Sequence, residues 1–472
     1  MSAPAPHNCA APAALLPALK RARPERYPFL LESTARGGSA RYSILFASPG
    51  ETLTLSQDFA LSPLPQGDDC MDAGGRAMPG AIAEGRVRGS NRFLANLDDW
   101  WQAERIATAT GNAEMPFRGG WFIYLGYELA GEIESVPLPP VDSALPIAFA
   151  TRIPAAIIYD HQRDHYFPVA EPERADLLNA LRDDLAHPPV LSGNAFRGPI
   201  SHLTEAPADD YLQSVARARE FIHAGDVFQV NLARAWHGEL VAGCEPGDIY
   251  ARLRQANPAP FSGWANCGDG AIVSSSPERL VRVSGERVET RPIAGTRPRH
   301  ADAARDNELM RQLMAHPKER AEHVMLIDLE RNDLGRIART GSVCVDEMMI
   351  TESYAHVHHI VSNVSARLNP ETTPGEVIRA VFPGGTITGC PKVRCMEIIA
   401  ELEGTRRGPY TGAMGYLNRD GDMDLNILIR TLVVEGNRLS FRAGAGIVAD
   451  SVPEFELEET RAKARGLLAA LC

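Results

Sequence analysis

The stretch GAIVSSSPERLVRV, residues 270–283, together with RVETRPIAG, residues 287–295, decides the fold class that the sequence predicts. Short apolar runs rich in Ile and Val alternate here with polar turn residues, as in strands paired in antiparallel hairpins. Between residues 27 and 190 the runs RYSILFAS, GGWFIYLGYELAG and IPAAIIYDH have the same character, separated by Gly/Pro turns. We therefore expect a mostly antiparallel sheet there, and more strands over 341–367 and 410–448.

Helical periodicity indicates several helices in the second half of the chain. One segment ends at Gly225 and has apolar residues at helical spacing, namely Leu212, Val215, Ala216, Phe221 and Ile222. Further helices are expected near 246–256, over 303–315, from Pro317 onward and from Ser451 to about Leu471. Glu454 is placed for a capping box in the last of these. Strand and helix blocks do not alternate strictly, so the sequence predicts an α+β fold with large antiparallel sheets.

The segment HPPVLSGNAFRGPI, residues 187–200, gathers Pro and Gly and predicts a boundary between two parts of the chain. We interpret residues 1–24 as a flexible Ala/Pro-rich tail, followed by regions 25–200 and 201–472. The basic residues of the tail follow its apolar part, which is not the order of a secretory signal.

Composition limits the partners of this 472-residue chain. A net charge of −12 argues against sequence-blind nucleic-acid binding. No apolar run approaches the ~18–20 residues that span a bilayer. The cysteines are scattered without a CxxC pair, at Cys9, Cys70, Cys244, Cys267, Cys344, Cys390, Cys395 and Cys472. This pattern indicates reduced thiols and a cytoplasmic protein.

Two predicted helices carry carboxylates on a shared face. Glu456 and Glu459 are three residues apart, with Lys463 one turn further on. Glu322 shares a stripe with Met325, Leu326 and Leu329, the side expected to face the core. A buried carboxylate needs a partner. Glutamates from two helices converging on Mg2+ would supply one, with an anionic substrate sharing the ion.

Two other segments resemble ligand sites only in part. FPGGTITGCPK, residues 382–392, is not a Walker loop, because Cys390-Pro391 follow the last glycine. We expect its glycine amides, Gly385 among them, to form an anion nest for a carboxylate. In YAHVHHIVS, His356 and His358 share one strand face and His359 lies on the other, which does not favour zinc. Pattern alone therefore predicts a Mg2+-assisted enzyme acting on a small carboxylated molecule.

Nine longer motifs extend this prediction. They are GDVFQVNLA, SSSPERLVRV, RPIAGTRPR, KERAEHVMLIDLERNDLGR, HHIVSNV, FPGGTITGCPKVRCMEII, YTGAMGYL, NILIRTLVV and AGAGIVADSVPEFELEETRAKA. In this order the chain resembles chorismate-utilising enzymes, densely over 205–472 and more loosely over 25–200. The resemblance implies an α/β complex in which two large antiparallel sheets pack as a sandwich with helices outside. It makes 25–200 an anthranilate-synthase-I-like region and 201–472 the chorismate-binding catalytic region.

The resemblance also implies roles for individual residues. Glu322, Glu456 and Glu459 are expected to hold the Mg2+ that binds the ring carboxylate of the substrate. Glu278 is expected to be the general acid for the departing C4 hydroxyl, since hydroxide is a poor leaving group. The other assignments are Arg430, Lys463, Tyr410 and the amides of Gly444, Ala445 and Gly446 for carboxylates, and His359 and Thr296 for the ring pocket.

Two positions bear on the nucleophile. Relatives that add water carry a lysine base where Gln229 stands, and an amide cannot take a proton, so ammonia is favoured. PFSGW at 260–264, HHIVS and FPGGTITG are similar to the branch that makes 4-amino-4-deoxychorismate for p-aminobenzoate and folate. Ala294 is instead the residue of the anthranilate branch, whereas many aminodeoxychorismate enzymes have lysine there. We favour the aminodeoxychorismate branch, with one ammonia replacing the lysine amine at C2 and a second arriving at C4. Anthranilate formation is the alternative.

The resemblance implies two further partners. FLLES at 29–33 is similar to the tryptophan pocket of anthranilate synthases, here Leu31, Glu32, Ser33, Tyr42, Pro260 and Phe261. A separate glutamine amidotransferase subunit is expected to supply ammonia, because no Gly-x-Cys-x-Gly elbow is present. A non-catalytic tryptophan- or chorismate-binding regulator is the remote alternative, which retention of the acid and the metal carboxylates disfavours.

Overall fold

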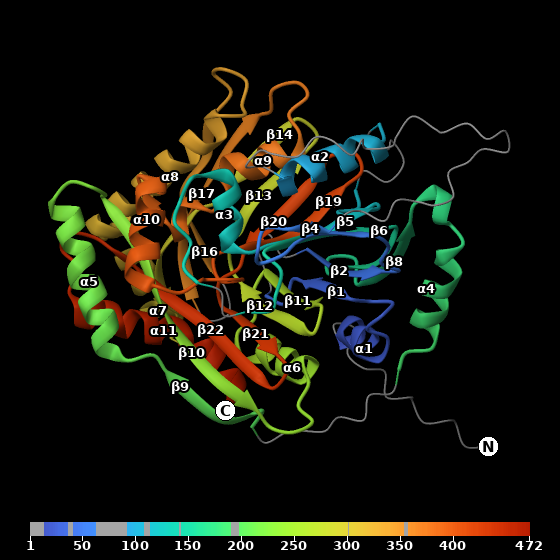
Figure 1. Cartoon of the computed structure of the whole chain (residues 1–472), viewed down its shortest axis with the longest axis horizontal. Coiled ribbons are helices and arrows are strands. Elements are labelled where there is room, and N and C mark those ends of the chain that lie inside the picture. The colour runs from blue at the N-terminus through green and yellow to red at the C-terminus, as the bar shows by residue number, and fades with distance from the viewer. Residues whose placement is uncertain are drawn as a thin grey trace.

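The computed structural model describes residues 14–35, 41–62, 92–107, 114–140, 143–189, 198–300, 302–353 and 357–472. Two large antiparallel sheets form the centre of the molecule, and helices cover their outer faces (Figure 1). The sandwich predicted from the sequence is therefore confirmed.

The first sheet contains strands from both halves of the chain, eleven in the described part. Its order is β18 (Gly389–Cys390), β10 (Gln229–Leu240), β22 (Arg438–Ile447), β21 (Thr431–Glu435), β12 (Gly270–Ser276), β11 (Phe261–Cys267), β1 (Phe29–Glu32), β2 (Tyr42–Ala47), β7 (Ala155–Asp160) and β8 (His165–Ala170), with β9 (Ile200–Glu205) also paired to β10. The pairing of β1 with β11 joins residues more than 200 positions apart in one ladder.

The second sheet also combines both halves, again with eleven strands in the described part. Its order is β15 (Ile293–Pro298), β17 (Val357–Arg367), β14 (Arg287–Thr290), β13 (Arg279–Ser284), β20 (Met423–Ile427), β19 (Ala413–Asn418), β5 (Gly120–Leu125), β6 (Ala148–Ile153), β3 (Thr52–Leu55) and β4 (Leu61–Ser62), with β16 (Cys344–Ser353) paired to β17. The hairpin stretch that predicted the fold is divided between the sheets, because β12 lies in the first and β13 in the second.

Aromatic and aliphatic side chains fill the space between the sheets. Phe29 of β1 stacks on Phe122 of β5, with ring centroids 4.0 Å apart and an interplanar angle of 4°. Phe149 of β6 packs beside both rings. Each buried aromatic side chain removes a large apolar area from water and supplies much of the energy that holds the layers together.

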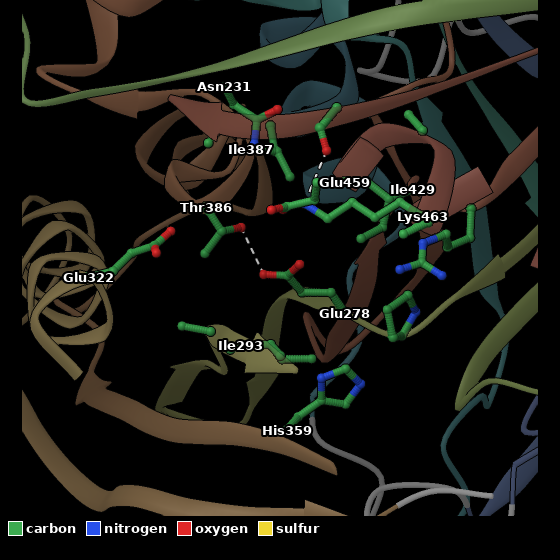
Figure 2. A pocket seen from close by; sticks show the side chains of 18 of the residues that line it. Asn231, Glu278, Ile293, Glu322, His359, Thr386, Ile387, Ile429, Glu459 and Lys463 are labelled. Carbon is green, nitrogen blue, oxygen red and sulfur yellow. Dashed lines mark hydrogen bonds and ion pairs between the residues drawn. The ribbon is translucent and has the colours of Figure 1, made fainter. Parts of the chain in front are cut away.

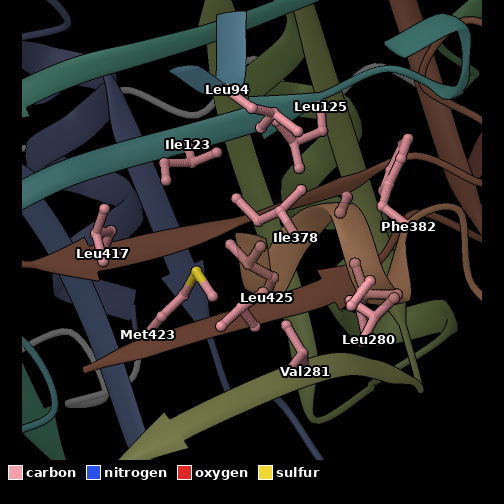
Figure 3. Close-up of a cluster of buried hydrophobic side chains, with 14 of the residues drawn as sticks. Leu94, Ile123, Leu125, Leu280, Val281, Ile378, Phe382, Leu417, Met423 and Leu425 are labelled. Carbon is pink, nitrogen blue, oxygen red and sulfur yellow. The ribbon is translucent and has the colours of Figure 1, made fainter. Parts of the chain in front are cut away.

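Eleven α-helices are described. They are α1 (Leu15–Ala22), α2 (Arg92–Glu104), α3 (Ala130–Ile133), α4 (Leu177–Ala186), α5 (Ala208–His223), α6 (Pro246–Ala256), α7 (Ala303–Ala315), α8 (Pro317–Gly335), α9 (Pro374–Val381), α10 (Lys392–Glu403) and α11 (Pro453–Leu471). Short 3-10 turns occur at Tyr127–Leu129 (η2), Pro172–Arg174 (η3) and Gly385–Ile387 (η4). Side chains of α2 and α9, such as Leu94 and Ile378, pack with Leu425 of β20 in one apolar cluster (Figure 3). The predicted helices at 246–256, 303–315 and from Pro317 are confirmed.

The N-terminal and C-terminal helices correct two predictions. Residues 15–22 belong to the segment interpreted as a flexible tail, but they form α1, whose Leu16 and Leu19 are buried in the core. Residues 1–13 lie outside the described residues. The capping box predicted for α11 was wrong, because the helix begins at Pro453 after Val452, which has no side-chain cap. Ser451 instead accepts a hydrogen bond from the backbone N–H of Val448 through its Oγ.

Besides α1, three helices in the N-terminal region were not predicted, namely α2, α3 and α4. In α2, Phe93, Leu97 and Trp101 are buried at a spacing of four residues, so a helical signal was present in the sequence. Helix α4 buries Leu181 against the first sheet. None of the helices in the described part of the chain combines the length and apolar character that crossing a bilayer requires.

Candidate functional site

A cavity of about 700 Å³ lies where β10 and β22 of the first sheet meet the β15–β17 edge of the second. Helices α8 and α11 and the η4 turn complete its wall (Figure 2). Twelve of the residues assigned from the sequence line it, namely Gln229, Glu278, Ala294, Glu322, His359, Tyr410, Arg430, Gly444, Gly446, Glu456, Glu459 and Lys463. Tertiary folding therefore brings together one acid, two cations and three further carboxylates from distant parts of the chain.

Glu278 is buried in this cavity between β12 and β13. The hydroxyl of Thr386 donates a hydrogen bond to its carboxyl Oε1 at 2.7 Å (Figure 2). Burial raises the pKa of Glu278 to about 7, although Thr386 and the nearby Lys463 both act to lower it. A carboxyl with this pKa keeps a large protonated fraction near neutrality, which a general acid requires.

Two cations face the same space. Arg430 has a left-handed backbone with φ of 53°, and its side chain makes no ion pair with any residue in the described ranges. Burial lowers the pKa of Arg430, because desolvation destabilises its positive charge. A bound anion would offset this cost. Lys463 donates from Nζ to the carbonyl of Gly444 at 3.0 Å and pairs with Glu459 at 2.8 Å. These groups can bind two carboxylates of a small substrate.

The carboxylates assigned to a metal come from two helices. Glu322 of α8 faces Glu456 and Glu459 of α11 across the cavity. Burial, with the nearby charges of Glu319 and Glu459, raises the pKa of Glu322. Like charges that raise the pKa of Glu322 are a setting that a divalent cation would relieve.

The donor set fits a hard cation in chemical type, because all of the donors are oxygens. Within the described ranges, however, no three His, Cys, Asp or Glu side chains lie close enough together to hold one ion. Glu459 is paired with Lys463 and is half exposed. Binding of Mg2+ would therefore require Glu459 to turn from the ammonium towards the ion.

Three further residues that line the cavity have distinct environments. Ala294 is buried on β15, and its backbone pairs with Ile360 of β17. Burial and the neighbouring Arg430 lower the pKa of His359 to about 4, so this ring is neutral at physiological pH. Gln229 donates from Nε2 to Glu322 Oε1 at 3.3 Å.

Two assigned residues, Gly385 and Ala445, do not line the cavity, and for a third, Thr296, the prediction stays open. Gly385 does not line the cavity, because a Cβ there would lie 2.1 Å from Leu329 of α8. The side chain of Ala445 packs in the apolar cluster beneath α5 and α10, since alternation along β22 turns only its two glycine neighbours to the cavity. Thr296 pairs with His359 through the backbone, but its side chain lies outside the described part. His356 is likewise outside the described residues.

The structure adds residues that the sequence did not indicate. Thr386, Asn231 and Arg442 line the cavity, and Arg297 pairs with Glu319 at its edge, 3.1 Å apart. Strand alternation could have predicted Asn231, which is two residues from Gln229 on β10. No local pattern indicated Thr386.

A second cavity of about 400 Å³ is lined by all six residues assigned to a tryptophan pocket. The hydroxyl of Ser33 donates to the carbonyl of Pro260 at 3.0 Å, which connects the two segments. Glu32 accepts from the hydroxyl of Tyr250 at 2.6 Å and pairs with Arg254 at 2.8 Å. The six residues are thus brought together, and the cavity is separate from that of Glu278.

Comparisons with known proteins agree with this geometry. The family described as chorismate binding enzyme matches residues 68–469. Anthranilate synthase component 1 of Thermus thermophilus is 39% identical over 461 residues, covering 96% of this chain and 94% of that protein. Aminodeoxychorismate synthase component 1 of Bacillus subtilis is 38% identical over 462 residues, covering 96% and 93%. The crystal structure of anthranilate synthase component I from Streptococcus pneumoniae has a TM-score of 0.75 at 30% identity, covering 92% of this chain and 93% of that one.

Proposed function

Because the chain belongs to the family of chorismate binding enzymes, we propose that it is an aminodeoxychorismate synthase component I. It would convert chorismate and ammonia to 4-amino-4-deoxychorismate and water. The observation that carries this proposal is the buried Glu278, with a pKa near 7, in a cavity that also contains Arg430 and Lys463. The relatives named for the two ammonia-using reactions are about equally similar, so the branch rests on PFSGW, HHIVS and FPGGTITG.

The chemistry requires a proton at the leaving oxygen. Glu278 donates its proton to the C4 hydroxyl, which leaves as water when the C–O bond breaks. Arg430 and Lys463 hold the two carboxylates of the substrate. His359 is neutral and lines the ring without adding charge.

Ala294 bears on the order of bond formation. One ammonia adds at C2 as the C4 hydroxyl leaves and the ring double bonds shift. A second ammonia then adds at C4 as the C2 amine leaves, so one ammonia is returned. Each added nitrogen loses one proton, and the net reaction consumes one ammonia and releases one water. If the pocket accepts an amine at this position, Ala294→Lys retains activity, whereas complete loss of activity in a folded variant contradicts this order.

The proposal includes a metal and a partner. Glu322, Glu456 and Glu459 would hold Mg2+, which supplies positive charge to the ring carboxylate of the substrate. A separate glutamine amidotransferase subunit would supply ammonia, with free ammonia as a substitute. A cytoplasmic location is part of the proposal, and the free thiols of the six described cysteines support it.

Anthranilate synthase component I is the second candidate, and the alanine at 294 is the observation that favours it. Purified protein with chorismate, Mg2+ and an ammonium salt separates the two. Fluorescent anthranilate formed without a lyase refutes our proposal. p-Aminobenzoate formed only after an aminodeoxychorismate lyase is added supports it. Turnover of either kind excludes the non-catalytic regulator.

The second cavity is proposed to bind tryptophan, because six residues from three segments line it together. Calorimetric titration of the protein with tryptophan tests this binding. Phe261→Ala, in the wall of that cavity, is expected to weaken binding, and unchanged heats of binding in this variant would contradict the assignment.

A further inference from the structure

A buried arginine outside the large cavity connects several segments around it. Arg407 lies in the loop between α10 and β19, its side chain is 1% exposed, and it does not line the cavity that contains Glu278. Burying a guanidinium is costly unless its donors are paired. The acceptors of its hydrogen bonds therefore show which parts of the chain it connects.

The guanidinium of Arg407 makes five hydrogen bonds. Nε and Nη2 donate to the two carboxylate oxygens of Glu403, at 3.0 and 2.5 Å. Nη2 also donates to the carbonyl of Asn231 at 2.8 Å. Nη1 donates to the carbonyl of Ile387 at 3.2 Å and to the hydroxyl of Thr411 at 3.4 Å. A guanidinium has five donors in a rigid fork, so the number of acceptors matches the number of donors.

These acceptors come from separate segments of the chain. Asn231 lies on β10, Ile387 in η4 and Thr411 in the turn before β19. Glu403, at the end of α10, also accepts a hydrogen bond from the N–H of Ala233 on β10 at 2.9 Å. Asn231 and Ile387 both line the cavity. One buried side chain therefore fixes η4 relative to β10.

The η4 turn carries the residue that contacts the acid. Thr386 is next to Ile387, and its hydroxyl donates to Glu278 at 2.7 Å (Figure 2). The turn has one further bond to β10, because the N–H of Asn231 donates to the carbonyl of Thr388 at 2.9 Å. A shift of about 1 Å would take the Thr386 hydroxyl beyond hydrogen-bonding distance of the acid. The position of η4 thus determines whether this hydrogen bond forms.

We infer that Arg407, together with Glu403, holds the η4 turn in the position from which Thr386 donates to Glu278. Arg407 is a positioning residue, because it acts on the acid through the turn and lies outside the cavity. This inference rests on the proposed function, in which Glu278 is the general acid. Lysine cannot replace this arginine, since its three donors share one atom and cannot reach the same set of acceptors.

Other ionisable groups face Glu278 from the elements around it. Lys463 of α11 lowers the pKa of Glu278, and Glu330 of α8 lies close enough for Glu278 to raise the pKa of Glu330. The same cavity contains His359, Arg430 and the three carboxylates assigned to the metal. A lysine at position 407 keeps the positive charge there, so these groups and Glu278 experience the same charges. A changed titration of Glu278 would therefore report a change in the turn.

The pH dependence of kcat/KM for chorismate tests this inference in the wild type, Arg407→Lys, Thr386→Val and the double variant. We expect Arg407→Lys to move the alkaline limb up by roughly 1 unit, because losing the Thr386 hydrogen bond destabilises the ionised acid. In the Thr386→Val background the same substitution should cause no further shift. A limb that stays in place or moves to lower pH overturns the inference, and so does an equal upward shift in both backgrounds.

Two further variants complete the experiment. Arg406→Lys is the matched control and should keep the wild-type limb, because Arg406 donates to the carbonyl of Pro139 at 2.9 Å and to Gln57 at 2.6 Å rather than to η4. If Arg407→Lys does not fold, Glu403→Asp takes its place. Aspartate keeps the charge that pairs with Arg407 but is shorter, so the limb should again move up, and an unmoved limb overturns the inference.

Infrared difference spectroscopy measures the titration of Glu278 without turnover. The carboxyl band that disappears in Glu278→Gln belongs to this residue, and its midpoint should move up in Arg407→Lys but not in Arg406→Lys. If the wild type does not consume chorismate with ammonium, the proposed function fails, and this titration alone decides the positioning role. An unchanged midpoint in Arg407→Lys overturns that role whether or not the enzyme is active.

Discussion

Thr386→Val tests the link between the structure and the acid chemistry most directly. The hydroxyl of Thr386 donates to Glu278 at 2.7 Å, and this hydrogen bond stabilises the ionised carboxylate. Valine removes the donor and keeps the shape. Hydrogen bonds to charged groups contribute about 1.5–3 kcal/mol, and one pKa unit corresponds to about 1.36 kcal/mol. The pKa of Glu278 should therefore rise by roughly 1–2 units from about 7.

The sign of the effect on activity follows from the role of Glu278. A general acid must be protonated, so kcat/KM for chorismate falls as the pH rises through the pKa of the free enzyme. In the wild type this fall should be centred near pH 7, and in Thr386→Val it should be centred roughly 1–2 units higher. The variant is therefore expected to be relatively more active than the wild type in alkaline solution.

The assay measures chorismate consumption from about pH 6 to about pH 10, with total ammonium adjusted to keep the concentration of neutral ammonia constant. Thr386→Ser is the control, because it keeps the hydroxyl and should keep the wild-type profile. An alkaline limb at the same pH in wild type and Thr386→Val would refute the reasoning, as would a limb displaced to lower pH.

Three further predictions concern binding, metal and stability. Arg430→Lys should raise the KM for chorismate by on the order of tenfold, because lysine cannot form the two parallel hydrogen bonds of a guanidinium. An unchanged KM would mean that Arg430 does not bind a carboxylate of the substrate. Glu322→Gln should raise the Mg2+ concentration for half-maximal activity about tenfold or more, and chelation should abolish wild-type turnover. The exposed Glu458→Gln is the control and should need the same Mg2+ concentration as the wild type. Lys20→Met should lower the free energy of unfolding by about 1–3 kcal/mol, because the buried Lys20 Nζ donates to the carbonyl of Pro28 and to Asn266 at 3.1 Å, and methionine donates to neither acceptor. An unchanged urea midpoint would contradict this.

Local patterns were enough to predict much of the fold and the type of chemistry. Apolar alternation indicated β12 and β13, and proline at the first turn indicated where α8 begins. The same patterns placed Glu322 on the inward stripe of its helix, and the structure confirms that it faces the cavity. These predictions succeeded because strand and helix periodicities depend on neighbours only a few residues away.

The arrangement of these elements depended on contacts between distant parts of the chain. Thr386 reaches Glu278 across 108 residues, and that contact together with burial determines the protonation of the acid. Alternation along β22 predicts that Gly444 and Ala445 lie on opposite faces of the strand, but not which of them faces the cavity. That depends on the packing of β10 and α5 beside β22. The sequence thus specified the chemical groups and their local periodicity. Burial, pKa and convergence came only from tertiary packing, because desolvation and electrostatic interactions depend on distance in space rather than on separation along the chain.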